Sequence, residues 1–184
     1  SSLVELAIVT SRQQFLNRLQ FALLRSARQR EYAFAVLVMG IDNHAHLLEK
    51  IESRNLRDFY ANLTKRIGSC LRNLDVPSHL DPEHFSILLD DVTDVIGAVR
   101  VAQRIQEETR KPFRLDQQEV VITCSFGVVL APFSYEHPED ILRDAHTALS
   151  RALQRGERQT VVFDDRQNNR AMQYFRIESE LKDA

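Results

Sequence analysis

One polar turn, set between two short apolar runs, carries the residue types of this chain that are best suited to chemistry. The turn reads, in order, Asp81, Pro82, Glu83, His84 and Phe85. Carboxylates bind hard cations such as Mg²⁺, and imidazole is a ligand for transition metals. The same side chains are also ordinary on a turn surrounded by water. The residues alone leave a cation site and a solvated turn both open.

Further histidines extend the metal hypothesis. His79 with His84, or His44 with His46 beside Asp42, could supply ligands to a transition metal. Neither group has the spacing of a recognised zinc site. We therefore predict no metal centre in this chain.

The residues around the turn predict that a β-hairpin positions it. Apolar runs of strand length flank the Pro-containing break within residues 76–92. Upstream, residues 32–41 form a near-continuous apolar run, as expected for a strand covered on both faces in the middle of a sheet. Further strands are expected at residues 120–125, 127–131 and 160–163.

Helices are expected wherever apolar residues recur at three and four positions. Polar side chains that can cap a helix precede four of these segments. These are Thr10 or Ser11, Asp42 or Asn43, Asn55, and Thr93. His137-Pro138 opens another helix, which Gly156 ends, and the charged tail from Arg166 to Ala184 is expected to be a helix that leaves the domain. The order of the segments predicts an α/β (α+β) domain with a mixed sheet.

Composition narrows the class of protein. The chain has 184 residues, 43% hydrophobic and 27% charged, which suits one ordinary globular domain. Its net charge of -2 gives no basic footprint for nucleic acid. No apolar run approaches the roughly 20 residues that span a bilayer, so we expect no direct membrane contact from this segment. Cys70 and Cys124 lack CxxC spacing and suit the reduced thiols of a cytoplasmic protein.

The turn, together with the segment KPFRLDQQEVVITCSFGVVLAP at residues 111–132, resembles the diguanylate cyclase, or GGDEF, family. The family's signature Gly-Gly-Asp/Glu-Glu-Phe lies at the tip of such a hairpin. The resemblance implies a central five-stranded mixed sheet wrapped by helices, related to the palm of nucleotidyl cyclases. It also implies a domain over residues 1–164 and a helical linker over residues 165–184 that leads to a following EAL phosphodiesterase domain.

The family joins two GTP molecules, and divalent cations held by carboxylates polarise the phosphates. The resemblance places the first of two metal-binding carboxylates at Gly40, where it is lost, and the second at Asp42. Glu83 retains the third signature position. The paired glycines are replaced by Asp81 and Pro82, and proline fixes φ and lacks an N–H.

Other family positions are also replaced. The guanine-reading Asn and the Asp that follows it correspond to Ser11 and Asn17, and two phosphate-binding lysines correspond to Ala45 and Leu153. Metal, base, backbone and phosphate contacts are therefore lost together. We expect no cyclase activity and no Mg-GTP cofactor.

A second constellation resembles the family's inhibitory site, an Arg-x-x-Asp motif that binds cyclic di-GMP. Arg72 and Asp75 have its offset from the turn, and Arg104 matches the second arginine. Arginine presents a planar fork to phosphate or guanine, and aspartate accepts from guanine N–H groups. Arg72 and Asp75 could equally be a surface ion pair that contributes little.

Two functions follow. The first is a catalytically inactive GGDEF module that regulates a neighbouring EAL domain or a protein partner in bacterial cyclic di-GMP signalling. The alternative is a cyclic di-GMP receptor that uses Arg72, Asp75 and Arg104. A GTP-binding allosteric domain is a third and less favoured hypothesis.

Overall fold

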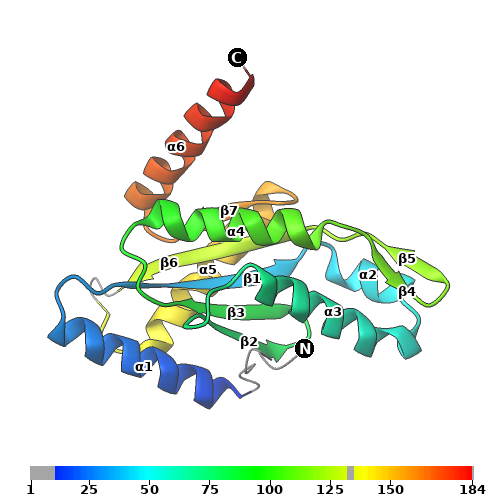
Figure 1. Cartoon of the computed structure of the whole chain (residues 1–184), viewed down its shortest axis with the longest axis horizontal. Helices are drawn as coiled ribbons and strands as arrows, with labels where there is room; N and C mark the ends of the chain where they lie inside the picture. The colour runs from blue at the N-terminus through cyan, green and yellow to red at the C-terminus, as the bar shows by residue number, and fades with distance from the viewer. Residues whose placement is uncertain (1–10, 132–134, 184) are drawn as a thin grey trace.

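The computed structural model describes residues 11–131 and 135–183, which fold around one five-stranded mixed sheet (Figure 1). The strand order is β2-β3-β1-β6-β7. The strands are β1 (Phe34–Ile41), β2 (Val76–Asp81), β3 (His84–Leu89), β6 (Cys124–Ala131) and β7 (Thr160–Val162). The β6–β7 pair is parallel, and the other three pairs are antiparallel. β1 lies in the middle and is buried along its whole length, which confirms the prediction from its apolar run.

Helices cover both faces of this sheet, as the predicted fold class requires. They are α1 (Arg12–Arg28), α2 (His44–Lys50), the 3-10 helix η1 (Ser53–Asn55), α3 (Leu56–Ser69), α4 (Val95–Thr109), α5 (Pro138–Arg155) and α6 (Asp165–Asp183). Alternate residues of β1 sort into two cores. Val36 and Val38 pack with α1 and α5, whereas Leu37 and Met39 pack with α2, α3 and α4. The sheet is therefore a middle layer between two groups of helices.

Gly127 allows α5 to lie directly on β6. A Cβ atom at this position would lie 2.1 Å from the backbone oxygen of Ala145. A glycine inside a strand often marks such a close approach. The predicted break between strands at 120–125 and 127–131 is therefore wrong. Residues 124–131 form the single strand β6, and a separate two-stranded hairpin joins β4 (Phe113–Leu115) to β5 (Gln118–Val120).

The predicted helix caps were right in part. Ser11 caps α1 through a hydrogen bond from the Gln14 N–H, and Thr10 lies outside the described residues. Asp94, not Thr93, caps α4, because its carboxylate accepts from the Ile96 N–H at 2.9 Å. Asn43 and Asn55 precede α2 and α3 without a side-chain cap bond.

The tail is helical, as predicted, but its first half belongs to the packed domain. Ala171 is fully buried, and the Arg170 guanidinium binds the Asp94 carboxylate at the start of α4 at 2.8 Å. Farther along α6, Glu178 pairs with Arg100 of α4 at 3.2 Å. In Figure 1, α6 begins beside α4 and rises away from the domain toward the C-terminus. None of the helices in the described ranges is both long and apolar enough to cross a bilayer.

Candidate functional site

Asp81 closes the hairpin turn with its own carboxylate. Its Oδ1 accepts hydrogen bonds from the backbone N–H groups of Glu83 and His84, each at 2.9 Å. The same oxygen lies 2.9 Å from Nδ1 of the His84 ring. This is an Asx-turn, in which a side chain replaces a backbone acceptor. The Asp81 carboxylate is therefore committed to the conformation of the turn.

Two separate contacts occupy the histidines next to the turn. The His79 ring stacks on Phe85 with centroids 4.1 Å apart, and burial lowers the pKa of His79. His44 Nε2 lies 2.9 Å from the Tyr60 hydroxyl, and its Nδ1 lies 3.7 Å from the Glu83 carboxylate. Glu83, in the turn between β2 and β3, thus faces His44 at the start of α2.

The structure does not assemble the metal ligands that the sequence suggested. His46 lies 3.7 Å from Glu49, whereas His44 faces Tyr60 and Glu83. Within residues 11–131 and 135–183, no three His, Cys, Asp or Glu side chains are grouped so that they could hold a metal ion.

The end of β1 is covered by α5. Gly40 pairs with His84 in the sheet, and a Cβ atom built on Gly40 would lie 3.2 Å from Cδ2 of Leu149. One turn earlier on α5, the His146 ring packs edge-on against His84 with centroids 5.1 Å apart. Burial, followed by the charge of His84, lowers the pKa of His146. Strand, turn and helix therefore meet through side chains at this point.

Asp42 is buried and has three hydrogen-bond donors from two other segments. Its Oδ1 accepts from the Ser125 hydroxyl at 2.8 Å, and its Oδ2 accepts from the Thr123 hydroxyl at 2.8 Å. The backbone N–H of Arg158, a residue with φ of 54°, also donates to Oδ2 at 2.9 Å. Asp42 thus joins β1, β6 and the loop after α5. Sequence reasoning missed these partners, because hydroxyls more than 80 positions away carry no local signal.

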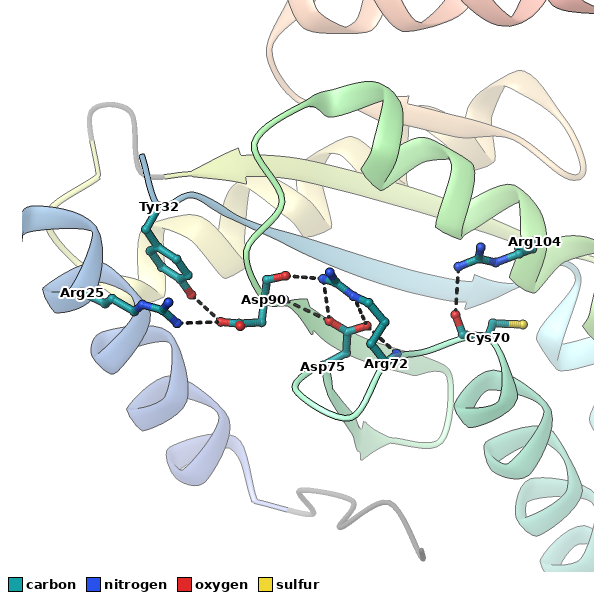
Figure 2. A network of polar contacts seen from close by, with 7 residues as sticks. All are labelled: Arg25, Tyr32, Cys70, Arg72, Asp75, Asp90 and Arg104. Atoms are coloured by element: carbon teal, nitrogen blue, oxygen red, sulfur yellow. Dashed lines mark hydrogen bonds and ion pairs between the residues drawn. The ribbon is translucent and has the colours of Figure 1, made fainter. Parts of the chain in front are cut away.

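The second constellation is a buried carboxylate beneath an exposed arginine (Figure 2). The Asp75 side chain is 2% exposed, and that of Arg72 is 59% exposed. Asp75 accepts from the backbone N–H of Arg72 at 2.8 Å and from that of Asp90 at 3.0 Å. The Arg72 guanidinium lies 3.2 Å from Asp75 and also donates to the Asp90 carbonyl oxygen. The pair is therefore more than a surface ion pair, because Asp75 ties two loops together.

Neighbouring side chains extend this network in both directions (Figure 2). Arg104 of α4 donates to the carbonyl oxygen of Cys70 at 3.1 Å, two residues before Arg72. On the other side, the Asp90 carboxylate accepts from the Tyr32 hydroxyl at 2.7 Å and lies 3.7 Å from Arg25. Burial and the bond to Asp90 raise the pKa of Tyr32. The structure thus places all three predicted residues along the segment from Cys70 to Asp75.

Comparison with known protein families identifies the family of this domain. The model of the family described as "Diguanylate cyclase, GGDEF domain" matches residues 5–159, which is most of the chain. The chain belongs to the GGDEF family. The five-stranded mixed sheet and its helices match the solved structures of GGDEF domains. The predicted fold class is confirmed.

Relatives of this GGDEF domain occur in cyclic di-GMP signalling proteins. The cyclic di-GMP phosphodiesterase NbdA of Pseudomonas aeruginosa is 27% identical over 161 residues, which are 88% of this chain and 20% of NbdA. The GGDEF domain of PA1120 from the same organism has a TM-score of 0.79 at 25% identity, covering 92% of this chain and 98% of that one. An EAL/GGDEF domain protein of M. capsulatus has a TM-score of 0.65 at 29% identity, covering 83% and 98%. The chain therefore spans about a fifth of the length of NbdA.

The remaining GGDEF positions that the resemblance singled out lie at the surface with local roles. Ser11 caps α1, and Asn17 accepts a hydrogen bond from Gln13 at 2.9 Å. Ala45 is exposed on α2, and Leu153 is partly exposed on α5. None of these four side chains carries a charge that could hold a phosphate.

Proposed function

We propose that this GGDEF domain does not synthesise cyclic di-GMP and acts as a regulatory module in a larger cyclic di-GMP signalling protein. The observation that carries the proposal is the set of contacts at the end of β1. Gly40 offers no carboxylate, and both oxygens of Asp42 already accept hydrogen bonds. A hard cation needs several oxygen ligands, so binding here would have to displace those donors.

Leu149 adds a steric reason. Its side chain approaches the place where a Cβ on residue 40 would stand to 3.2 Å. A carboxylate restored at residue 40 would therefore need Leu149 to move. With Ala45 and Leu153 at the phosphate positions, restoring one group would leave the other contacts missing.

The test is an assay of the purified domain with GTP and Mg²⁺, with the products separated by chromatography. We expect no cyclic di-GMP from the native chain or from Pro82→Gly. An active GGDEF domain in the same buffer is the positive control. Product that forms with the native chain and disappears with Glu83→Ala would refute the proposal.

The regulatory part rests on α6 and on the relatives. The relatives include phosphodiesterases several times longer than this chain, and an EAL/GGDEF protein is among the solved structures. We propose that α6 links this domain to a following EAL domain and transmits its position through the Arg100–Glu178 and Arg170–Asp94 pairs.

In the protein that carries this domain, the double variant Arg100→Ala/Arg170→Ala should change the rate of cyclic di-GMP hydrolysis. The exposed Arg114→Ala is the matched control, because Arg114 points outward from the β4–β5 hairpin. Equal hydrolysis rates in the native protein, the double variant and the control would contradict the linkage.

A second candidate is a cyclic di-GMP receptor at Arg72, Asp75 and Arg104. The exposed guanidinium of Arg72, held in place by a buried carboxylate, favours it. Such a positioned fork suits phosphate or a guanine edge. If the domain binds a nucleotide, we expect it to bind here and not at the turn.

Titration calorimetry of the domain with cyclic di-GMP, and separately with GTP and Mg²⁺, tests this candidate and the less favoured GTP-binding one. Arg72→Ala and Arg104→Ala should each weaken cyclic di-GMP binding about tenfold or more, since a charge-assisted contact contributes on the order of 1.5 to 3 kcal/mol. Arg114→Ala should bind like the native chain. Saturable binding that neither Arg72→Ala nor Arg104→Ala affects would place the ligand elsewhere.

A further inference from the structure

Among the residues that the structure describes, a groove lies between α1 and the edge strand β2. Its apolar walls are Phe21, Ala22, Leu74, Val76 and Leu88, Arg25 and Tyr32 also line it, and the hollow measures about 360 Å³. Phe21 is 69% exposed and Leu74 is 71% exposed. Single exposed apolar residues are common, but two that flank one hollow form a patch suited to binding. We call this surface the α1–β2 groove.

The free charge beside the α1–β2 groove is positive. The sequence of α1 contains four arginines and no acidic residue. Asp90, the acidic residue that lines the groove, already accepts from Tyr32 and faces Arg25. Arg18 also lines the groove, and it forms no ion pair within the described part of the chain. An occupant of the groove should therefore be apolar with a negative charge beside it.

The end of α6 has this character. Ile177 and Leu181 lie one helical turn apart and are 54% and 72% exposed. Residues four apart share one face of a helix. Glu180 flanks this pair, and it too lacks an ion-pair partner among the residues that the structure describes. We call Ile177 and Leu181 the α6 stripe.

The two surfaces cannot meet within one molecule. α1 packs with α5 on one face of the sheet, whereas the start of α6 is fixed to α4 on the opposite face (Figure 1). We infer that the α6 stripe of one copy docks into the α1–β2 groove of a second copy, with Glu180 facing Arg18. The contact joins different surfaces and is therefore heterologous, so a pair of copies keeps one groove and one stripe free for further copies.

One helix end in one groove makes a small contact. Stable complexes bury roughly 1,200 Å² or more, so we expect weak, concentration-dependent association of the isolated domain. Sedimentation of the native chain should show a mean mass above its 21.3 kDa at high micromolar concentration. A chain that stays monomeric up to about millimolar concentration would overturn the inference.

A complementation experiment tests the head-to-tail geometry. Phe21→Asp removes the groove, and Leu181→Asp removes the stripe. Each variant alone should be monomeric, because Phe21→Asp keeps a stripe but offers no groove, and Leu181→Asp keeps a groove but offers no stripe. Mixed one to one, they should form a dimer of twice the chain mass that does not grow further. A mixture that stays monomeric, or a Phe21→Asp chain that still self-associates, would show that the contact is not between groove and stripe.

A charge exchange tests the register of the contact. Arg18→Glu and Glu180→Arg should each weaken association severalfold, and the double variant should restore it. Val121→Ser, which changes an exposed apolar residue away from both surfaces, should have no effect. Because all these positions are exposed, melting curves should match that of the native chain. A double variant no better than the single ones would overturn the pairing of Glu180 with Arg18.

Discussion

Replacing Asp75 should destabilise the domain much more than replacing its partner Arg72. The Asp75 carboxylate is 2% exposed and accepts from two backbone N–H groups, at 2.8 and 3.0 Å. Hydrogen bonds to a charged group contribute about 1.5 to 3 kcal/mol each, and the abandoned N–H groups regain some bonding to water. We therefore expect Asp75→Ala to cost roughly 3 kcal/mol of unfolding free energy. Arg72→Ala removes an exposed guanidinium and should cost about 1 kcal/mol or less.

Urea unfolding followed by circular dichroism measures both costs. For a domain of this size, roughly 3 kcal/mol corresponds to a melting temperature lower by about 6 to 12 °C. Asp75→Asn keeps one acceptor oxygen and should fall between the native chain and Asp75→Ala. Equal losses for Asp75→Ala and Arg72→Ala would refute the assignment of Asp75 as the residue that ties the two loops.

This difference in stability between Asp75→Ala and Arg72→Ala decides which variants can test the candidate cyclic di-GMP site. A loss of cyclic di-GMP binding in Asp75→Ala would also follow from rearrangement of the two loops that Asp75 joins, before β2 and after β3. A loss in Arg72→Ala, with a nearly native melting temperature, would report the contact itself. The two arginines are therefore the informative positions.

Three further predictions concern the core and its titration. Asp42→Ala should lower the unfolding free energy by on the order of 3 kcal/mol in urea titrations, because three donors lose one buried acceptor, and a cost below about 1 kcal/mol would contradict that role. Burial lowers the folded-state pKa of His79 and His146, so the unfolded chain binds more protons below about pH 6.5. The unfolding free energy should therefore be full above that pH and fall as the pH drops toward the lowered pKa values of the folded state. Urea midpoints that do not fall between pH 7 and 5 would oppose this. Truncation after Phe163 should lower the melting temperature, because it removes the buried Ala171, and an unchanged melting curve would show that α6 adds nothing.

The truncation prediction reverses an expectation drawn from the tail's charge. A strongly charged helix with few apolar residues suggests a segment outside the core. Alanine carries almost no hydrophobic signal in such a pattern, yet Ala171 is fully buried in the core, and Met172 and Phe175 pack against the same core. Small size allows the close approach that a larger apolar residue would prevent. Arg170 then reaches Asp94, which is far away in the sequence.

The fold could be predicted because its strongest signals are local and periodic. The apolar run of β1, the Pro-containing turn and the helical spacing of α5 each specify an element without knowledge of the others. The error in the strands arose where a distant segment decides the local structure. Gly127 looks like a strand break, and only the backbone of α5 above it shows why the strand continues through it.

The candidate binding residues came from the resemblance, Arg72 and Asp75 by their offset from the turn and Arg104 by its match to the family's second arginine. That they bind a nucleotide stays a prediction, and their contacts could not be predicted. That Asp75 is buried depends on the N–H of Asp90, which a hydrophobicity pattern cannot place. The hydroxyl partners of Asp42 are Thr123, just before β6, and Ser125 in β6, and polar residues in and beside a strand give no sign of which carboxylate they will meet.

The contacts at the end of β1 also bear on the proposal that this domain does not synthesise cyclic di-GMP. A metal site keeps carboxylates close together and short of protein partners, so that the ion can complete their bonding, and such sites cost stability when empty. Here Asp81 bonds the turn, Asp42 bonds three donors, and Leu149 packs over Gly40. The two carboxylates thus already accept hydrogen bonds within the protein, and Leu149 fills the space beside Gly40. The arrangement therefore favours a rigid hairpin that presents a surface over a hairpin that opens to bind GTP.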